Sequence, residues 1–363
     1  MIYLDYQATT PLAPEAFEAM LPWLRDSHAN PHSSHAPGRA AKAAVEVARE
    51  QVVGLLPAEG SLAFTSGATE ALNWAIKGTV GPIVTIATEH AAVVDTVEAL
   101  GRQGRAVTVL PVGRDGLVDL AAAERAIVPG TGLVAAMLVN NEIGVIQPIT
   151  ALADLAHKAG ALMLCDAVQG YGRVPIPDGC DMIAVSAHKI HGPKGIGALW
   201  VRNGVVLEPL IHGGRQEGLG RSGTLSPALC AGFGVAAQMM AERADSDRAH
   251  VERLFGMARQ QFGPGWTING STAHRYPGNL NMRCEGLDVA RLMSDLRDIA
   301  FSAGSACASG SGRSSHVLRA IGLNEAQARS SIRIGFGRYT TEEELVTAID
   351  RIMAAAATQQ VTP

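Results

Sequence analysis

Short apolar runs alternate with amphipathic segments along the first two thirds of the chain. The runs are rich in Val, Ile and Leu and predict buried strands, whereas the segments between them have the spacing of helices with one apolar face. Continuous apolar strands separated by helices are typical of an α/β protein with a mostly parallel sheet covered on both faces. Strands are expected at 62–65, 83–87, 106–110, 132–139, 161–165, 182–186 and 197–201, and helices at 39–56, 68–78, 91–103, 119–127 and 149–159.

The pattern changes after about residue 245, where longer helices and isolated strands follow one another. This change predicts a large domain at 13–245 and a smaller α+β domain at 246–363. Residues 1–12 suit either domain, and we assign them to the small one. Thr341 and Glu344 have the spacing of a capping box, which marks the start of a final helix. Further helices are expected at 241–262, 288–296 and 315–321, strands at 279–283, 299–301 and 331–335, and a Gly/Ser-rich loop at 302–315.

The composition excludes several classes of protein. The 363 residues carry a net charge of −4, so the bulk charge favours neither direct nucleic-acid binding nor a polybasic membrane anchor. The N-terminus lacks the pattern of a signal peptide, and the longest apolar stretches fall short of the roughly 18 residues that span a bilayer. The five cysteines are scattered and form no CxxC pair, which disfavours a disulfide framework or a zinc site. We therefore expect a reduced, cytoplasmic protein without a bound metal or a membrane partner.

Five polar clusters follow predicted strands, each directly after the carboxyl end of its strand. Ligands of open parallel sheets bind at that edge, so clusters in successive strand–loop units predict one crevice that they line together. The absence of GxGxxG and GxxxxGK[ST] motifs disfavours a dinucleotide or a P-loop nucleotide as the ligand. The clusters are 66–70 (SGATE), 89–90 (EH), 140–142 (NNE), 166–169 (DAVQ) and 186–189 (SAHK).

Two of these clusters suggest how a phosphorylated cofactor is held. Residues Ser66 to Thr69 join a strand to a helix start, where backbone N–H groups and the helix dipole favour a phosphate. Ordinary N-capping by Ser66 or Thr69 is the structural alternative. Lys189 lies at a strand end between two histidines, a setting in which a deprotonated amine forms a Schiff base with an aldehyde cofactor. A solvated loop lysine is the alternative.

Asp166 and His90 fit the same cofactor. Asp166 ends an apolar strand, so its carboxylate needs a cationic partner, and the protonated pyridine nitrogen of pyridoxal phosphate is one such partner. A salt bridge or a helix cap is the alternative for Asp166. His90 is placed to stack on a ring or to move protons, although a lone histidine is more often structural. One ligand explains the phosphate cup, Lys189, Asp166 and His90 better than four independent structural roles.

Two candidate residues lie in the second part of the chain. Cys307 is surrounded by small and polar residues in a Gly/Ser-rich loop, where a thiol can be exposed and reactive. Cys165 and Cys230 lie in apolar segments and are expected to be inert. Arg333 is a charge on a short strand, suited to a bidentate contact with a carboxylate. An incidental surface thiol and a structural ion pair are the respective alternatives.

These motifs resemble those of the pyridoxal-phosphate-dependent cysteine desulfurases of the class V aminotransferase superfamily, the NifS/IscS type. They occur in the order of that family over nearly the whole chain. The resemblance implies the aspartate-aminotransferase-like fold of PLP-dependent transferases and a homodimer. The matching segments are 3–11 (YLDYQATTP), 65–70 (TSGATE), 88–90 (TEH), 140–144 (NNEIG), 166–169 (DAVQ), 188–195 (HKIHGPKG), 221–224 (RSGT), 304–307 (GSAC) and 331–333 (SIR).

The resemblance also implies a role for each candidate residue. Lys189 would bind pyridoxal 5′-phosphate covalently and later move the α-proton of the substrate. His90 would stack on the cofactor ring and assist proton transfer, and Asp166 would pair with the ring nitrogen. Cys307 would be the nucleophile that takes the sulfur. The remaining contacts would be Gln169 at the phenolic oxygen, Ala68, Thr69, Ser186 and His188 at the phosphate, Thr224 at the phosphate of the partner subunit, and Asn141 with Arg333 at the substrate carboxylate, Asn141 also touching the cofactor.

The implied reaction converts L-cysteine to L-alanine and leaves a persulfide on Cys307. A sulfur-acceptor or iron–sulfur scaffold protein would receive this sulfur for iron–sulfur cluster assembly or tRNA thiolation. A selenocysteine lyase, or another class V lyase or transaminase, is the alternative enzyme, and a catalytically silent binding subunit is the alternative outside catalysis. A transaminase needs no thiol at position 307, and a silent subunit needs no intact set of Lys189, Asp166, His90 and Cys307. Gln7 replaces a serine of many relatives, a change from which we expect a small effect.

Overall fold

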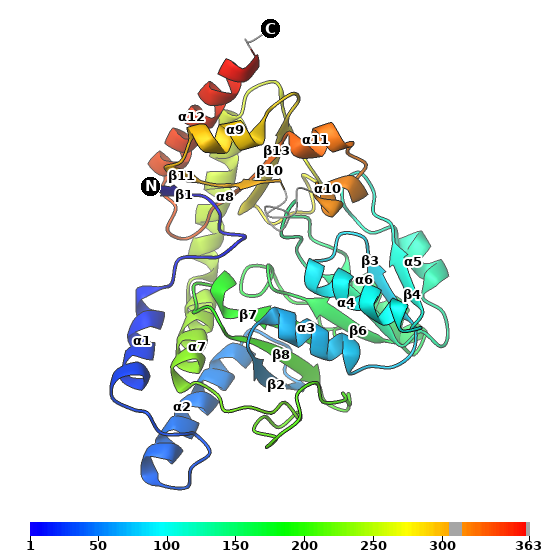
Figure 1. Ribbon diagram of the computed structural model, residues 1–363, viewed down its shortest axis with the longest axis vertical. Coiled ribbons are helices and arrows are strands. Elements are labelled where there is room, and N and C mark those ends of the chain that lie inside the picture. Colours follow the sequence, from blue (N-terminus) through cyan, green and yellow to red (C-terminus); the bar gives the residue numbers. More distant parts are fainter. Residues whose placement is uncertain (305–313, 361–363) are drawn as a thin grey trace.

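A computed structural model of the chain describes residues 1–304 and 314–360 and contains two parts (Figure 1). The larger part is built around a seven-stranded sheet and the smaller one around a four-stranded sheet. In the large sheet only β8 runs antiparallel to its neighbours, so the predicted α/β architecture with a mostly parallel sheet is confirmed. From edge to edge the strands are β2 (Gly60–Thr65), β8 (Gly197–Arg202), β7 (Met182–Ser186), β6 (Leu162–Asp166), β5 (Leu133–Met137), β3 (Ile83–Ile86) and β4 (Val107–Leu110).

Helices cover both faces of the large sheet and bury its apolar strands. Successive side chains of a strand point to opposite faces, so Ala63 joins the hydrophobic cluster on one face and Phe64 the cluster on the other. One face carries α3 (Ala68–Lys77) and α4 (Ala91–Arg102), and the other carries α2 (Ala36–Val53), α5 (Leu120–Ala126), α6 (Ile149–Lys158) and α7 (Pro227–Glu242). Outside this layer, α1 (Pro14–Arg25) packs against α7.

The smaller part has its own hydrophobic cluster between an antiparallel sheet and long helices. The sheet order is β12 (Ser302–Ala303), β13 (Ser331–Gly335), β10 (Asn279–Cys284) and β9 (Trp266–Ile268). The helices are α8 (Ala244–Gln261), α9 (Val289–Asp295), α10 (His316–Ala320), α11 (Glu325–Arg329) and α12 (Glu342–Gln360). At the start of α12, Thr341 Oγ1 accepts a hydrogen bond from the N–H of Glu344 and Glu344 Oε2 accepts one from the N–H of Thr341, so the predicted capping box is confirmed.

The N-terminal segment connects the two parts. In the smaller part, β1 (Ile2–Tyr3) pairs with β11 (Ile299–Ala300) in parallel, and Leu4 belongs to the hydrophobic cluster. A few residues later the backbone N–H of Thr10 donates to the carbonyl of His188 in the larger part. The segment therefore crosses the edge at which the strands of the large sheet end. The division of the chain at residues 12 and 245 stays a prediction.

Several elements differ from the sequence-based expectations. The helix expected at 241–262 begins at Ala244, and the separate helix α7 before it is absent from the expectations. Most of α7 is buried on all sides, so it lacks the polar face that makes a helix visible in a sequence. The start of the loop expected at 302–315 forms β12, and residues 305–313 lie outside the described part of the chain. None of the helices in the described part is both long and apolar enough to cross a membrane.

Candidate functional site

The carboxyl ends of the large sheet's parallel strands open into a cavity of about 580 Å³, which we call the cofactor cavity. Most candidate residues from separate stretches of the sequence line it together. Thr224 is exposed and does not line this cavity, and Cys307 lies outside the described residues. The candidate residues that line it are Ala68, Thr69, His90, Asn141, Asp166, Gln169, Ser186, His188, Lys189 and Arg333.

Lys189 is positioned by a short helical turn at the end of a central strand. The turn η1 (Ala187–Lys189) follows β7, and the side chain of Lys189 is half-buried. Its Nζ donates to the backbone carbonyl of Gln7 at 2.5 Å and to that of Ala8 at 2.8 Å. The N-terminal segment thus holds the amine in place at the cavity, a contact that the sequence pattern did not reveal.

Asp166 provides a buried carboxylate at the end of β6. Only 5% of the residue is exposed, and its Oδ1 accepts a hydrogen bond of 3.0 Å from the N–H of Val168. Burial raises the pKa of Asp166, while His90 and Lys189 act in the opposite direction. Because burial disfavours the charged carboxylate, a cationic group that enters the cavity beside Asp166 would favour ionisation.

His90 precedes α4 and caps its first turn. Its Nδ1 accepts a hydrogen bond of 3.1 Å from the N–H of Ala92, so the neutral ring carries its proton on Nε2. Burial lowers the pKa of His90, which favours this neutral ring at pH 7. The neighbouring Glu89 is fully buried, its Oε1 accepts from the N–H of Met137 at 2.6 Å, and burial raises its pKa well above the ordinary value.

The first turn of α3 offers a site for a phosphate. The N-cap of α3 is Gly67 and no side chain of the described residues caps the helix, so the alternative of capping by Ser66 or Thr69 is wrong. The uncapped N–H groups and the helix dipole favour an anion at this end of the cavity. His188 lies beside it, and burial lowers the pKa of His188 to about 4, so its ring is neutral at pH 7. Its Nδ1 lies 3.2 Å from the hydroxyl of Thr9.

Arg333 lies in the part of the cavity wall formed by the small sheet. The residue is 1% exposed and sits on β13. Its Nη2 forms an ion pair with Asp5 Oδ1 at 2.7 Å, and its Nη1 donates to the carbonyl of Asn141 at 3.0 Å. Its Nε has no hydrogen-bond partner among the residues that the structure describes. A substrate carboxylate is the kind of group that would satisfy this donor.

Gln169 and Arg173 link the cavity to the segment that carries the lysine. Gln169 Nε2 donates to the carbonyl of Gln7 at 2.8 Å, and its Oε1 accepts from Arg173 Nη1 at 3.0 Å. Arg173 Nη2 also donates to the carbonyl of Lys189 at 2.5 Å. Sequence reasoning missed Arg173 because it stands four residues after the DAVQ motif with no local pattern of its own. No site role was expected for Gln7, and the structure gives its carbonyl two contacts in the site.

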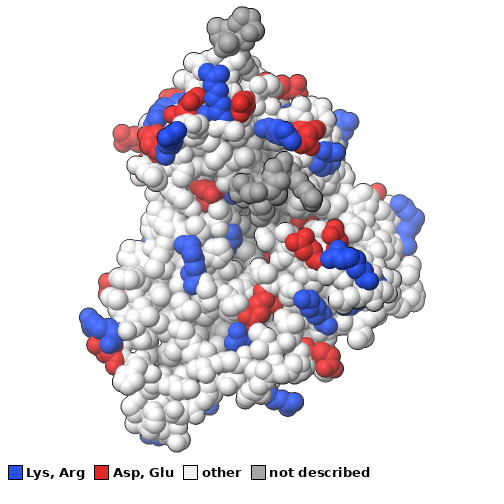
Figure 2. Space-filling model, in the orientation of Figure 1, with Lys and Arg blue, Asp and Glu red and all other residues white. Residues whose placement is uncertain are grey.

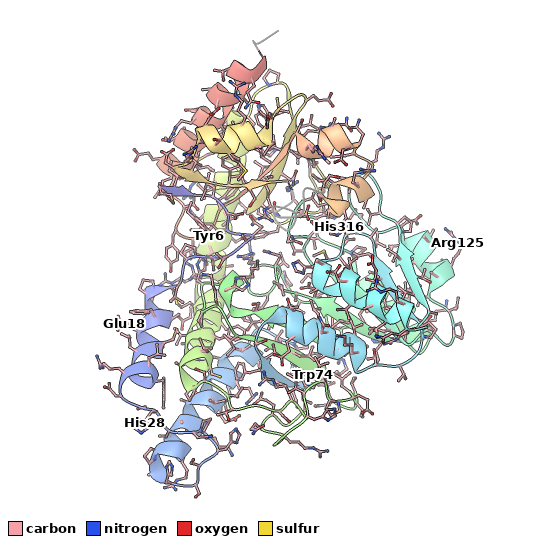
Figure 3. The ribbon with its side chains drawn as sticks, viewed as in Figure 1. Tyr6, Glu18, His28, Trp74, Arg125 and His316 are labelled. Carbon is pink, nitrogen blue, oxygen red and sulfur yellow. The ribbon has the colours of Figure 1, made fainter. Side chains whose placement is uncertain are left out.

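The segment after the undescribed residues is fixed against the same site. His316, labelled in Figure 3, donates from Nε2 to the carbonyl of Glu89 at 2.8 Å. The hydroxyl of Ser315 donates to the carboxylate of Glu142, which is itself buried. These contacts bring α10 of the smaller part next to the residues that precede α4 in the larger part.

The donor set of the cofactor cavity fits pyridoxal 5′-phosphate. An uncapped helix start suits the phosphate, a buried carboxylate suits a protonated ring nitrogen, and the amine of Lys189 lines the same cavity. The neutral His90 offers a flat ring at the same cavity. By contrast, the described residues contain no group of three or more His, Cys, Asp or Glu side chains suited to a metal ion.

Comparisons with known proteins agree with this geometry. The class-V aminotransferase family model matches residues 2–347. A curated relative, cysteine desulfurase IscS of Rickettsia bellii (strain OSU 85-389), is 43% identical and aligns over 97% of this chain and 90% of its own length. A solved NifS-like protein superposes with a TM-score of 0.91 at 32% identity, covering 98% of this chain and 99% of that one. A structure of SspA in complex with cysteine has a TM-score of 0.83 at 36% identity, covering 94% and 100% respectively.

Proposed function

The chain belongs to the class-V aminotransferase family and is a cysteine desulfurase, and from this premise we propose that it uses pyridoxal 5′-phosphate on Lys189 to move the sulfur of L-cysteine to Cys307. The observation that carries the proposal is the convergence of Lys189, Asp166, His90 and the uncapped start of α3 on one cavity. These groups come from four separate strand–loop units, and no structural role of the large sheet requires all of them there.

Different residues of the cavity would contact different parts of the cofactor. The N–H groups of Ala68 and Thr69, with the side chains of Thr69, Ser186 and His188, would hold the phosphate. Asp166 would pair with the ring nitrogen, His90 would stack on the ring, Gln169 would hydrogen-bond the phenolic oxygen, and Asn141 would also contact the cofactor. When bound, the cofactor supplies an aldehyde that captures the amine of L-cysteine and a protonated ring that accepts the electron pair released at Cα.

Lys189 and His90 handle the protons of the reaction. Lys189 Nζ would hold the cofactor, and the same amine would move the proton of the substrate's Cα. The carbonyls of Gln7 and Ala8 hold Nζ at 2.5 and 2.8 Å, which limits its positions in the cavity. His90 presents its Nε2 proton because Nδ1 is engaged by the N–H of Ala92.

Arg333 and Cys307 act on the substrate itself. The guanidinium of Arg333, with its unpartnered Nε, and the side chain of Asn141 bind the carboxylate of L-cysteine and orient the molecule. The thiolate of Cys307 then attacks the substrate sulfur. A bond forms between the two sulfur atoms while the Cβ–S bond breaks, and its electron pair stays on the carbon side. After protonation the products are L-alanine and a persulfide on Cys307.

Mass spectrometry after one turnover tests this function. Incubation with L-cysteine should produce L-alanine and add the mass of one sulfur atom to the peptide that contains Cys307. Cys307→Ser should bind L-cysteine and lose the added sulfur, whereas Cys284→Ser, which replaces a buried cysteine of β10, should keep it. Undiminished release of sulfide by Cys307→Ser under reductant would contradict the proposed nucleophile. A preference for selenocysteine in the same assay would favour the lyase alternative.

The functional unit is a homodimer. Thr224 is exposed and lies away from the cavity of its own subunit, as a contact with the partner's phosphate requires. The helices α1 and α2 present exposed apolar side chains, including Phe17, Leu24 and Val47. Figure 2 shows few charged residues on the surface over these two helices, a character that suits a subunit interface. Sedimentation should give twice the mass of one chain.

The sulfur on Cys307 passes to an acceptor or iron–sulfur scaffold protein, for cluster assembly or tRNA thiolation in the cytoplasm. A transfer assay with radiolabelled L-cysteine tests each acceptor. Label on the acceptor that is lost with Cys307→Ser supports transfer, and label that persists in this variant contradicts it.

A further inference from the structure

A second cavity lies where the two parts of the molecule meet, beside the joint between α7 and α8. We call it the junction cavity; it has a volume of about 510 Å³ and shares no lining residue with the cofactor cavity. Tyr6, which lines it, is labelled in Figure 3 at the level where the N-terminal segment passes between the two parts. Much of its wall is apolar, from Leu55, Val174, Ile176, Met240, Val251 and Tyr276.

Positive charge exceeds negative charge around this apolar wall. Four arginines line the cavity, against the two carboxylates of Asp247 and Glu252. Asp247 is engaged in an ion pair with Arg338 at 2.6 Å. Arg248 lies 3.7 Å from Asp245, and both of these side chains are exposed. The remaining two arginines form no ion pair with a carboxylate in the described part of the chain; they are Arg173 and Arg275.

Arg275 is a buried cation that lacks a counter-ion. The residue is 8% exposed, and within the described part of the chain its guanidinium donates only to backbone carbonyls, those of Ser271, Ile143 and Asn279. Its Nε has no hydrogen-bond partner among the described residues, and neither has Nη1 of Arg338, whose side chain is 6% exposed. Burial lowers the pKa of Arg275 to about 10. A buried cation without a counter-ion is costly, so the charge of Arg275 would stabilise an anion bound in the junction cavity.

Arg173 connects this cavity with the catalytic lysine. Its guanidinium lies over the ring of Tyr276, 5.3 Å from the ring centre, on the junction cavity side. The same guanidinium donates to Gln169 Oε1 and to the carbonyl of Lys189. An anion that attracts Arg173 would therefore change hydrogen bonds that position the cofactor cavity.

We propose that the junction cavity binds a small carboxylate with an apolar body and that Arg173 relays its presence to Gln169 and Lys189. The apolar wall accommodates the body, and the excess of positive charge from the arginines that line the cavity attracts the carboxylate. The binding site stands on its own lining residues and does not depend on sulfur transfer. A failure to bind therefore leaves the proposed desulfurase activity untouched.

Binding of benzoate to the holoenzyme, followed by saturation-transfer NMR and calorimetry at fixed ionic strength, tests the site. Benzoate should bind with a dissociation constant of about a millimolar, as expected for a ligand of this size, and the neutral benzamide should bind at least about tenfold more weakly. Equal binding of the two probes, or binding of neither, would overturn the proposal.

Two exposed residues at the rim give a matched pair of charge variants. Both Arg248 and Glu252 are exposed, so their substitution should leave the fold intact. Arg248→Gln should weaken benzoate binding about two- to fivefold and Glu252→Gln should strengthen it by a similar factor. A shift of both dissociation constants in the same direction would overturn the assignment. Arg275→Met should remove benzoate binding. If that variant does not fold, Arg248→Gln and Glu252→Gln decide whether benzoate binds in the junction cavity.

Two further variants locate the ligand and test the relay. Arg333→Lys alters the cofactor cavity, so benzoate binding should survive it; loss of binding would put the ligand there and contradict the proposal. Benzoate should also shift the visible absorbance band of the holoenzyme. Arg173→Lys should keep the binding and lose the shift. An unchanged band in the unsubstituted enzyme with bound benzoate would refute the relay.

Discussion

The two walls of the cofactor cavity handle charge in different ways. The sheet wall, formed by His90, Asp166 and the residues 186–189, contains three groups that burial drives toward their neutral forms, namely His90, Asp166 and His188. The small-sheet wall is formed by Arg333, whose Nη2 contacts Asp5 and Ser302 and whose Nε has no hydrogen-bond partner among the described residues. The sheet wall therefore changes its charge in response to a cofactor, whereas the small-sheet wall offers a fixed cation to an anionic substrate.

This difference separates two kinds of defect. Substitutions in the sheet wall should change the cofactor, its absorbance and the rate of the chemical step. Substitutions in the small-sheet wall should change substrate affinity and leave the cofactor spectrum intact. The following variants sharpen or break this separation, in order of decreasing effect.

Lys189→Ala should have the largest effect. Loss of the amine removes both the covalent attachment and the group that moves the α-proton, so alanine formation should fall by at least about 10³-fold. Lys194→Ala is the matched control, because Lys194 lines the same cavity and is exposed. The visible absorbance band of the bound cofactor should persist in Lys194→Ala. If Lys189→Ala kept the band and Lys194→Ala lost it, the cofactor would be attached to Lys194, and the account would be contradicted.

Asp166→Asn should lower kcat by about 10²- to 10³-fold, since an amide cannot hold the ring nitrogen in its protonated form. Glu89→Gln is the matched control in the same buried region. Burial raises the pKa of Glu89 well above its ordinary value and so disfavours the charged carboxylate, so an amide of the same shape should change kcat less than about threefold. Steady-state kinetics give kcat for both variants, and the absorbance spectrum of each variant reports on its cofactor. An equal loss of kcat in the two variants would show that the effect follows from changing any buried polar group in this region, and not from removing the charge of Asp166.

Arg333→Lys should raise KM for L-cysteine by roughly 10- to 100-fold, because a lysine loses the planar fork that binds a carboxylate. The cofactor spectrum should stay unchanged. Arg283→Lys is the control, since Arg283 belongs to the same sheet on β10 and does not line the cavity. A spectrum altered by Arg333→Lys, with KM unaffected, would contradict the separation of the two walls.

The smallest effect concerns stability as a function of pH. The pKa of Glu89 in the folded protein lies well above its ordinary 4.5, so the native state binds more protons than the unfolded state between these two values. The free energy of unfolding should therefore fall as pH rises above about 4.5, with a slope of at most about 1.4 kcal/mol per pH unit from this group. Glu89→Gln should lack this contribution in urea unfolding at several pH values. Parallel pH profiles for both proteins would contradict a raised pKa for the buried Glu89.

The sequence predicted the sheet wall far better than the small-sheet wall. Local patterns marked the buried strands, and the rule that ligands bind at carboxyl ends of parallel strands gathered His90, Asp166 and Lys189. The contact of Lys189 with the carbonyl of Gln7 joins residues 182 positions apart, and no local pattern reports such a pairing. The same holds for the ion pair of Arg333 with Asp5, whose existence depends on how β13 meets the N-terminal segment.

The missed elements have a related cause. Helix α7 is buried on nearly all sides and so shows no amphipathic period. The short strands β9 and β12 gain their partners from β10 and β13, which lie elsewhere in the sequence. By contrast, the capping box at Thr341 is a purely local arrangement, and the sequence was sufficient to predict it.

Reduction of the purified enzyme with borohydride tests the central claim most directly, because it fixes the cofactor to the amine that holds it. After digestion, mass spectrometry should find the pyridoxyl group on the peptide that contains Lys189 and on no other lysine. A label on Lys194, or the absence of any labelled peptide from a yellow protein, would contradict the account of this cavity.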